Sequence, residues 1–481
     1  MEKIRPLHSR YNPEGEAERY IDSLSITGNV KFFILIEPGM GYLSIFLHAK
    51  FPAAKILSIY AERPPESNFR KNITDNFWSP MDKITLRDFL ENEIPDVEAK
   101  EIKIIEWRPS LAVYGKAYCK ILSETVEFIK QSDASARTGN QFSLRWFKNF
   151  FRNLNLLSKI IYPAAFTFPV LITGAGPGLE ETIPEIRANS ENLFLIAVSS
   201  SAAALKAANI EPDLIIATDG GNWALLHLYE CFRKHADSAI PINNKPELAV
   251  NLTAAIPSQC ANSPMLILCD NSLWQSLLFR ELKIPTIILP QRGTVSASAL
   301  DLAFSMTNNN VYLTGVDLSN RDIQSHVRPY SFDRLWEEKA GRFCPVYSQV
   351  YGRSVLIREG GSHNIYASWF ARQLSAYPKR LFTLGTNHSV FNGLKKIKTS
   401  QKIPVIKNFQ KKPALDYFCI NREKNPAMRA AYLLKDAIVS SQFSGKLCEE
   451  LRFLAPTEPD AAKLGNAVLE ITRPFWNKQY E

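Results

Sequence analysis

Glycine, hydroxyl and carboxylate side chains follow three successive apolar runs in the middle of this 481-residue chain. Gly174-Ala175-Gly176-Pro177-Gly178 follows the first run, Ser199-Ser200-Ser201 the second and Asp219-Gly220-Gly221 the third. A glycine-rich turn before a helix can bring backbone N–H groups to an anion at the positive end of that helix. Hydroxyls and a carboxylate on neighbouring turns can hydrogen-bond a ribose or a base. The pattern predicts nucleotide binding without fixing which nucleotide is bound.

The runs themselves predict one half of a doubly wound parallel sheet, in the order β-α-β-α-β. We expect strands at 169–173, 193–199 and 213–219, with helices beginning near 180 and 201. Polar loops at the carboxyl ends of such strands are where nucleotides bind. Strands at 265–269, 286–289 and 311–316 and a helix at 294–306 continue the sheet. That helix is entered through Gly293-Thr294, a second position for a phosphate or a ribose.

A smaller Rossmann-like unit is predicted near the N-terminus. Strands at Lys31–Glu37 and Ala54–Tyr60 enclose the turn Pro38-Gly39-Met40-Gly41, and Glu62 comes about 20 residues after the glycines. Glu62 could bind the ribose of an adenosine, or a strand could simply end there. The unit predicts a Rossmann-like fold and leaves its ligand open.

Changes in composition predict the domain boundaries. Residues 131–140 are small and polar, and residues 142–160 form an amphipathic pattern expected to pack between domains. Seven lysines and no acid lie between Lys395 and Lys412, and the pattern is helical from about 425. We therefore predict the following four parts: an N-terminal Rossmann-like α/β domain at 1–140, a central Rossmann-like nucleotide-binding domain at 141–394, a basic linker at 395–424 and a helical C-terminal region at 425–481.

Charge and cysteine usage exclude several classes of protein. The net charge is +9, but the lysine run at 395–412 supplies seven of these charges, so a nucleic-acid partner is not predicted. Seven scattered cysteines without a CxxC pair predict free thiols and neither a disulfide framework nor a metal site. No signal peptide and no apolar run of transmembrane length is visible. These features predict a cytoplasmic protein.

Several motifs, taken in order along the chain, resemble the bacterial Maf (motility-associated factor) flagellin glycosyltransferases. The opening His8-Ser9-Arg10-Tyr11-Asn12-Pro13-x-x-Glu16-Ala17-Glu18 is similar to the start of that family. The turn Gly174–Leu179 resembles its G-x-G-P-S-L motif, with Gly178 in place of the serine. The match continues through 212–220, 293–303, Leu313-Thr314-Gly315-Val316-Asp317-Leu318 and a following histidine, His326.

The resemblance implies a fold and an activity. The central domain of that family resembles CMP-sialyltransferases and the archaeal 6-hydroxymethylpterin pyrophosphokinases, which are called MptE-like. It implies a glycosyltransferase that moves a nonulosonic, sialic-acid-like sugar from a CMP-activated donor to Ser or Thr of flagellin in the cytoplasm. It implies no required cofactor and no metal, because the nucleoside monophosphate is a good leaving group.

The resemblance also implies roles for individual residues. His326 would accept the proton of the attacking hydroxyl, since an imidazole titrates near neutral pH, and Asp317 would be the second catalytic residue. His363 is the competing base. Gly174 and Gly176 would direct backbone donors at the phosphate or ribose. The remaining residues expected to contact the nucleotide are Ala175, Pro177, Gly178, Ser199, Ser200, Asp219, Gly220, Gly293 and Thr294.

Two other functions stay open at this point. Asp213 and Asp219 bracket a strand and could hold Mg²⁺ for pyrophosphoryl transfer from ATP, although Asp213 could equally be a strand-entry residue after Pro212. The protein could instead be a non-catalytic flagellin-binding module. Separate N- and C-terminal parts favour a macromolecular acceptor, because they add surface that a small pterin does not need.

Overall fold

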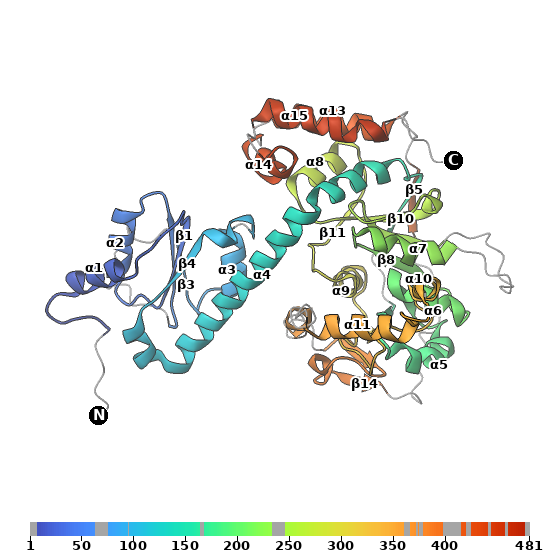
Figure 1. Ribbon diagram of the computed structural model, residues 1–481, viewed down its shortest axis with the longest axis horizontal. Helices are drawn as coiled ribbons and strands as arrows, with labels where there is room; N and C mark the ends of the chain where they lie inside the picture. Colours follow the sequence, from blue (N-terminus) through green and yellow to red (C-terminus); the bar gives the residue numbers. More distant parts are fainter. Residues whose placement is uncertain are drawn as a thin grey trace. The chain divides into compact units, whose positions relative to one another are not determined.

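The computed structural model describes residues 7–62, 76–94, 96–163, 168–232, 246–359, 366–371, 374, 379–397, 415–419, 425–440, 444–456 and 460–476. The chain forms two compact units, Met1–Gln141 and Phe142–Glu481. Each unit is built on its own sheet with helices packed against it (Figure 1). The predicted α/β class, with two Rossmann-like sheets and a helical C-terminal region, is confirmed.

The N-terminal unit has four parallel strands in the order β3-β2-β1-β4. Its strands are β1 (Phe32–Ile36), β2 (Lys55–Ile59), β3 (Asn76–Trp78) and β4 (Ile102–Glu106). Its helices are α1 (Pro13–Ser23), α2 (Tyr42–Lys50), α3 (Leu86–Glu93) and the 3-10 helix η2 (Asp96–Glu101). Every residue of β1 is buried, which is why this central strand is a continuous apolar run in the sequence. Both predicted strands of this unit are confirmed.

Helix α4 (Arg108–Leu154) begins in the first unit and ends in the second. It has a kink at Gly115, whose φ of +46° is not helical. Residues 131–140, predicted as a domain boundary or a loop, are not a loop but continue α4, and the two units divide just after them, between Gln141 and Phe142. Small polar residues without a proline can remain helical, so their composition alone did not mark a chain break. Neither α4 nor any other helix in the described part of the chain is long and apolar enough to cross a membrane.

The second unit contains an eleven-stranded sheet in the order β14-β13-β12-β6-β7-β8-β9-β10-β5-β15, with β11 paired to β10. All of the pairings are parallel except that of β15 with β5. The strands are β5 (Lys159–Pro163), β6 (Val170–Thr173), β7 (Phe194–Val198), β8 (Leu214–Ala217), β9 (Leu248–Asn251), β10 (Pro264–Cys269), β11 (Ile287–Ile288), β12 (Val311–Thr314), β13 (Leu381–Leu384), β14 (Lys395–Ile397) and β15 (Leu415–Cys419).

Helices cover this sheet and connect its strands. Helix α9 packs across β6, β7 and β8, and its residues 295–306 agree with the predicted helix at 294–306. The helices before the C-terminal region are α5 (Leu179–Asn189), α6 (Ala202–Ala207), α7 (Leu225–Phe232), α8 (Leu273–Glu281), α9 (Val295–Met306), α10 (Asp333–Lys339) and α11 (Val346–Glu359). The short 3-10 helices are η3 (Ser199–Ser201), η4 (Asn222–Ala224), η5 (Ser258–Cys260) and η6 (Ser389–Phe391).

The predicted linker and C-terminal region are partly different in the structure. Residues 395–397 and 415–419 of the linker are strands β14 and β15 of the central sheet. The C-terminal helices are α13 (Pro426–Ser440), α14 (Ser444–Glu450), η7 (Arg452–Leu454), α15 (Ala461–Thr472) and η8 (Arg473–Phe475). They lie beside α8 (Figure 1) and bury their apolar faces in the core of the second unit. The helical region is therefore part of that unit.

The strand order locates the switch point of the central sheet. From β6 the chain proceeds outward through β7, β8, β9 and β10, and it then returns to form β12 on the other side of β6. In an open parallel sheet, ligands bind beyond the carboxyl ends of the strands at such a reversal. The loops after β6 and β12 therefore lie at the expected position of a binding site.

Candidate functional site

The glycine-rich turn after β6 is bound to the end of β12. Gly174 and Gly176 donate their N–H groups to the carbonyls of Thr314 and Gly315, at 2.8 and 2.7 Å. Gly178 N–H donates to the Asp317 carboxylate, at 3.0 and 3.1 Å from its two oxygens. In this structure all three N–H groups hydrogen-bond within the protein, and the donor role predicted for Gly174 and Gly176 stays a prediction.

The glycines of this turn are required by close packing. A Cβ atom on Gly176 would lie 2.0 Å from Asp317 Oδ2, and one on Gly178 would lie 2.3 Å from the Thr386 carbonyl oxygen. Both distances are shorter than any non-bonded contact allows. The serine that the Maf-like motif carries at position 178 has no room in this conformation, which accounts for the glycine there.

Asp317 follows β12, and its buried carboxylate packs against the glycine-rich turn. Burial raises the pKa of its carboxyl to about 6, while the Gly178 N–H bond and the charge of Arg321 oppose the rise. The carboxylate accepts the hydrogen bond of the Gly178 N–H at the start of α5. A ligand anion was predicted to bind at this position. This geometry favours a positioning role for Asp317, and its catalytic role stays a prediction.

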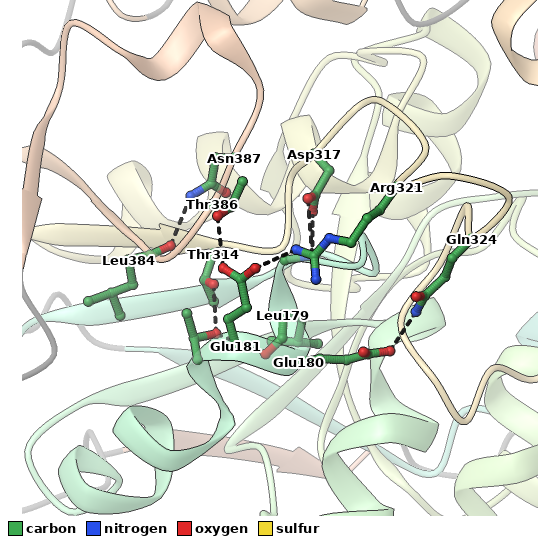
Figure 2. A network of polar contacts seen from close by, with 12 residues as sticks. Leu179, Glu180, Glu181, Thr314, Asp317, Arg321, Gln324, Leu384, Thr386 and Asn387 are labelled. Atoms are coloured by element: carbon green, nitrogen blue, oxygen red, sulfur yellow. Dashed lines mark hydrogen bonds and ion pairs between the residues drawn. The ribbon is translucent and has the colours of Figure 1, made fainter.

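Two glutamates at the start of α5 hold the segment after β12 (Figure 2). Glu180 accepts hydrogen bonds from Gln324 Nε2 at 2.6 Å and from the Arg328 N–H at 2.8 Å. Glu181 accepts from Arg321 Nη2 at 2.6 Å and from Thr386 Oγ1 at 2.8 Å. The segment that carries the predicted base is therefore fixed to the helix that follows the glycine-rich turn.

His326 lies in this segment and is half-buried. Its ring stacks on Tyr330 with a centroid distance of 4.1 Å and an interplanar angle of 16°. Its Nδ1 is 2.9 Å from Ser325 Oγ. The next residue, Val327, donates its N–H to the Ala175 carbonyl at 2.8 Å, which joins His326 to the glycine-rich turn. The structure thus brings His326, Asp317 and the turn together at the switch point.

The loops after β8 and before α9 reach the same side of the sheet. Burial raises the pKa of Tyr330 and of Tyr366, and the negative charge of exposed Asp219 contributes to both shifts. A Cβ on Gly293 would lie 3.4 Å from Tyr366 Cε1. Tyr330 stacks on His326 and Tyr366 lies beside Gly293, and sequence reasoning missed both tyrosines.

The other predicted residues of these loops have different surroundings. Ser199 is buried and Ser200 half-buried in η3, at the end of β7. Gly220 packs against Trp146 of α4, since a Cβ there would lie 2.2 Å from Trp146 Cδ1. Thr294 is half-buried at the N-cap of α9. His363, the competing base, lies outside the described residues.

The two carboxylates proposed for Mg²⁺ lie at opposite ends of β8. Asp213 precedes the strand and accepts the Leu195 N–H at 2.8 Å, whereas Asp219 follows the strand. Five residues lie between them, and the four that form β8 alone span roughly 13 Å, so the pair cannot share one ion. Asp213 is a strand-entry residue. Among the described residues no group of three His, Cys, Asp or Glu side chains is arranged to hold a metal ion.

Aromatic side chains and an arginine that sequence reasoning missed border this site. Tyr330, Phe332 and Trp336 pack against one another, with centroid distances of 5.2 to 6.2 Å. The Arg353 guanidinium lies over Phe332 and Trp336. Their spacing follows no simple period, because they come from a loop and two helices. The density of aromatic residues between 330 and 351 was the available signal.

Comparison with known proteins finds a similarity in the central part of the chain. Residues 144–322 match the family model described as 6-hydroxymethylpterin diphosphokinase MptE-like. These residues are similar to that family and are called the MptE-like domain below. The predicted resemblance is confirmed for this central part of the chain. The MptE-like domain includes the glycine-rich turn, Asp219 and Asp317, and it ends four residues before His326.

Two individual proteins are similar over longer regions. An uncharacterized protein of Treponema pallidum (strain Nichols) is 27% identical over 306 residues, which cover 63% of this chain and 65% of that protein. A Maf glycosyltransferase structure from Magnetospirillum magneticum AMB-1 aligns over 96% of this chain and 78% of its own, with 13% identity and a TM-score of 0.48. A score at this level does not establish a common fold.

The N-terminal motif His8–Glu18 supports the first glycine-rich turn, outside the MptE-like domain. His8 accepts the Met40 N–H on Nε2 at 3.1 Å and stacks on Trp107. Glu16 accepts the Ser9 N–H at 2.8 Å. Asn12 caps α1 through the Gly15 N–H. In this structure the motif attaches the N-terminal segment to the β1–α2 turn.

Glu37, which sequence reasoning missed, lies at the end of β1 in the N-terminal unit. It is 2% exposed, and its carboxylate accepts the Ala61 N–H. Burial raises the pKa of Glu37 to about 7, and the nearby charge of Glu62 adds to the rise. Glu62 is exposed, and its negative charge helps to raise the pKa of the Glu37 carboxyl. Its predicted ribose contact stays a prediction.

Glu37→Gln is expected to stabilise the N-terminal unit above pH 7. Between the unfolded pKa of 4.5 and the folded value of about 7, the folded state binds more protons than the unfolded chain, so the wild type loses stability as pH rises. The isosteric amide removes this loss, which amounts to up to about 3 kcal/mol. Hydrogen exchange of the β1 amides at pH 5 and pH 8.5 measures the effect. A gain of equal size at both pH values would contradict the titration argument.

Proposed function

We propose that this protein is a glycosyltransferase that moves a nonulosonic sugar from a CMP-activated donor to Ser or Thr of flagellin. The observation that carries the proposal is the position of His326, which is fixed beside the glycine-rich turn at the switch point of the MptE-like sheet. The motif resemblance to Maf proteins supports the donor and the acceptor. Cytoplasmic action without a metal belongs to the same proposal.

In the proposed reaction, the acceptor hydroxyl attacks the anomeric carbon of the sugar. The new C–O bond forms as the bond between that carbon and the CMP phosphate oxygen breaks, and CMP departs with the electron pair. His326 accepts the hydroxyl proton. Asp219 and the hydroxyls of Tyr330 and Tyr366 contact the donor. Glu180 and Glu181 position the segment that carries His326.

A diphosphokinase is the second candidate, and the description of the matching family model favours it. Transfer of a pyrophosphoryl group from ATP requires Mg²⁺ held by carboxylates. Asp213 and Asp219 do not fit such a site, because β8 lies between them. We therefore derive no metal-dependent step and rank the glycosyltransferase first.

Calorimetric titration with CMP and with ATP, each in Mg²⁺ and in EDTA, tests the proposal. We expect CMP to bind equally well in EDTA. Asp219→Asn is expected to weaken CMP binding, whereas the matched control Asp213→Asn, at the opposite end of β8, is expected to leave it unchanged. ATP binding that requires Mg²⁺, without a CMP signal, would favour the diphosphokinase.

Flagellin distinguishes an enzyme from a binding module. Purified protein, flagellin and a CMP-nonulosonate donor are mixed, and both CMP release and the mass of flagellin are followed. The proposal expects CMP release together with a mass increase equal to one or more sugars. Tight flagellin binding without either change would favour the non-catalytic module.

A further inference from the structure

Arg353 is a half-buried cation on α11. Its guanidinium carbon lies 5.4 Å from the Phe332 ring centroid and 5.6 Å from the Trp336 centroid. Its Nε atom is inaccessible to water and has no hydrogen-bond partner among the described residues. The aromatic rings interact with the face of the guanidinium, but its N–H groups lie in the plane and still require acceptors.

Other arginines of the second unit have such acceptors. Arg292, Arg321 and Arg334 form ion pairs with carboxylates at 2.6 to 2.7 Å. In the part of the chain that the structure describes, no carboxylate lies within ion-pair distance of Arg353. Arg353 is half-buried and its Nε is inaccessible to water, so the cation is partly desolvated without an anion, which is unfavourable. An anion at its terminal nitrogens would stabilise it.

The guanidinium is connected to the candidate site through ring contacts, since it lies over Phe332, which packs against Tyr330, the residue that stacks on His326. Burial and, to a smaller extent, the positive charge of Arg353 together lower the pKa of His227 to about 4. The same charge opposes the rise in the pKa of Tyr330, the residue that stacks on His326. His227 and Tyr330 both pack against Phe332, the ring that the Arg353 guanidinium covers, with centroid distances of 5.2 Å.

The position of α11 is fixed relative to the segment that carries His326. Asn320 Nδ2 donates to the Ser354 carbonyl at 2.8 Å, one residue beyond Arg353. Asp333, the acidic group near Tyr330 on the adjacent helix, accepts the Tyr330 N–H at 2.7 Å. The helix that carries Arg353 and the residue that stacks on His326 are therefore both held by hydrogen bonds.

We propose that Arg353 binds an oxyanion of the donor substrate, through the planar N–H groups that suit a carboxylate or a phosphate. The inference rests on the proposed function, whose donor carries both anions: the phosphate of CMP and the carboxylate of the nonulosonic sugar. Phe332 and Trp336 hold the guanidinium in position and exclude water from one side of it.

Titration with cytidine, CMP and CMP-N-acetylneuraminate tests this inference on wild type, Arg353→Met and Arg353→Lys. Loss of one charged contact is expected to weaken binding about 10- to 100-fold in Arg353→Met. Arg353→Lys keeps the charge but loses the planar donors, so an intermediate loss is expected. Arg334→Met is the matched control, because Arg334 is exposed and paired with Glu338 within α10. Near-ultraviolet circular dichroism verifies that each variant is folded.

The probes separate the sources of the anion and the two hypotheses. Weaker CMP binding with unchanged cytidine binding assigns the phosphate, whereas a loss confined to CMP-N-acetylneuraminate assigns the carboxylate. If wild type binds these ligands and both Arg353 variants bind them equally well, the inference is wrong and the proposed function stands. If wild type binds neither CMP nor CMP-N-acetylneuraminate, the proposed function and the inference are both overturned.

Discussion

Replacing His326 with alanine is expected to slow sugar transfer about 10²- to 10⁴-fold, the usual contribution of a general base. Stacking on Tyr330 and the contact with Ser325 fix the imidazole beside the glycine-rich turn. The substitution removes the proton acceptor and leaves the donor contacts in place. Single-turnover release of CMP, measured with saturating flagellin, gives the chemical rate.

The comparison with His388→Ala controls for loss of an imidazole as such. His388 lies on the loop after β13 and accepts the Val390 N–H at 3.2 Å on Nδ1. We expect this variant to retain its transfer rate. The binding constant for CMP should be the same in both variants and in wild type. A His326→Ala variant that transfers within threefold of wild type would show that His326 is not the base.

Gly176→Ala is expected to destabilise the second unit by about 3 kcal/mol, at the upper end of the usual cost of overpacking. The new methyl group would lie 2.0 Å from Asp317 Oδ2, and the Gly178 N–H holds that carboxylate in place. Relief requires moving either the turn or the end of β12. Urea unfolding followed by far-ultraviolet circular dichroism measures the free energy.

Gly352→Ala is the matched control for this substitution. Gly352 lies inside α11, and a Cβ there would have no atom within 4 Å. Alanine in a helix interior is expected to stabilise by up to about 1 kcal/mol. Equal free energies of unfolding for the two variants would contradict the packing described for the glycine-rich turn.

Much of the fold could be predicted from local patterns. Strands β1, β6, β7 and β12 are short apolar runs bounded by glycine or polar residues, which is typical of buried parallel strands. The helix at 294–306 was also predicted, because its apolar positions recur with helical spacing. In these elements the buried positions require apolar side chains, so the sequence pattern directly reports which residues are buried.

Other elements could not be predicted because distant residues determine them. Strand β15 is antiparallel to β5, and their residues are about 250 positions apart in the sequence. The lysines of β14 suggested a linker, although two of its three residues are exposed and tolerate charge on a strand. Local patterns also do not encode the order of the strands in the sheet, so the switch point could not be predicted from them.

The sequence placed the candidate residues on loops after neighbouring strands, but it could not predict the contacts that these residues make. The glycines of the 174–178 turn are required, as the sequence indicates, but a carboxylate 139 residues away explains two of them. A glycine-rich pattern indicates that a side chain would not fit at these positions, but it does not identify the neighbouring group that a side chain would contact. Tyr330, Tyr366 and Arg353 were missed because their importance depends on tertiary neighbours.

The bonds from Glu180 and Glu181 to the segment after β12 have a consequence for the order of events in folding. The Glu180–Gln324 pair joins residues 144 positions apart, so it can form only after the intervening strands have assembled. Until then no contact from Glu180 or Glu181 orients His326. A refolding chain should therefore recover helical and strand content first and transfer activity last, with the delay set by closure of this long loop.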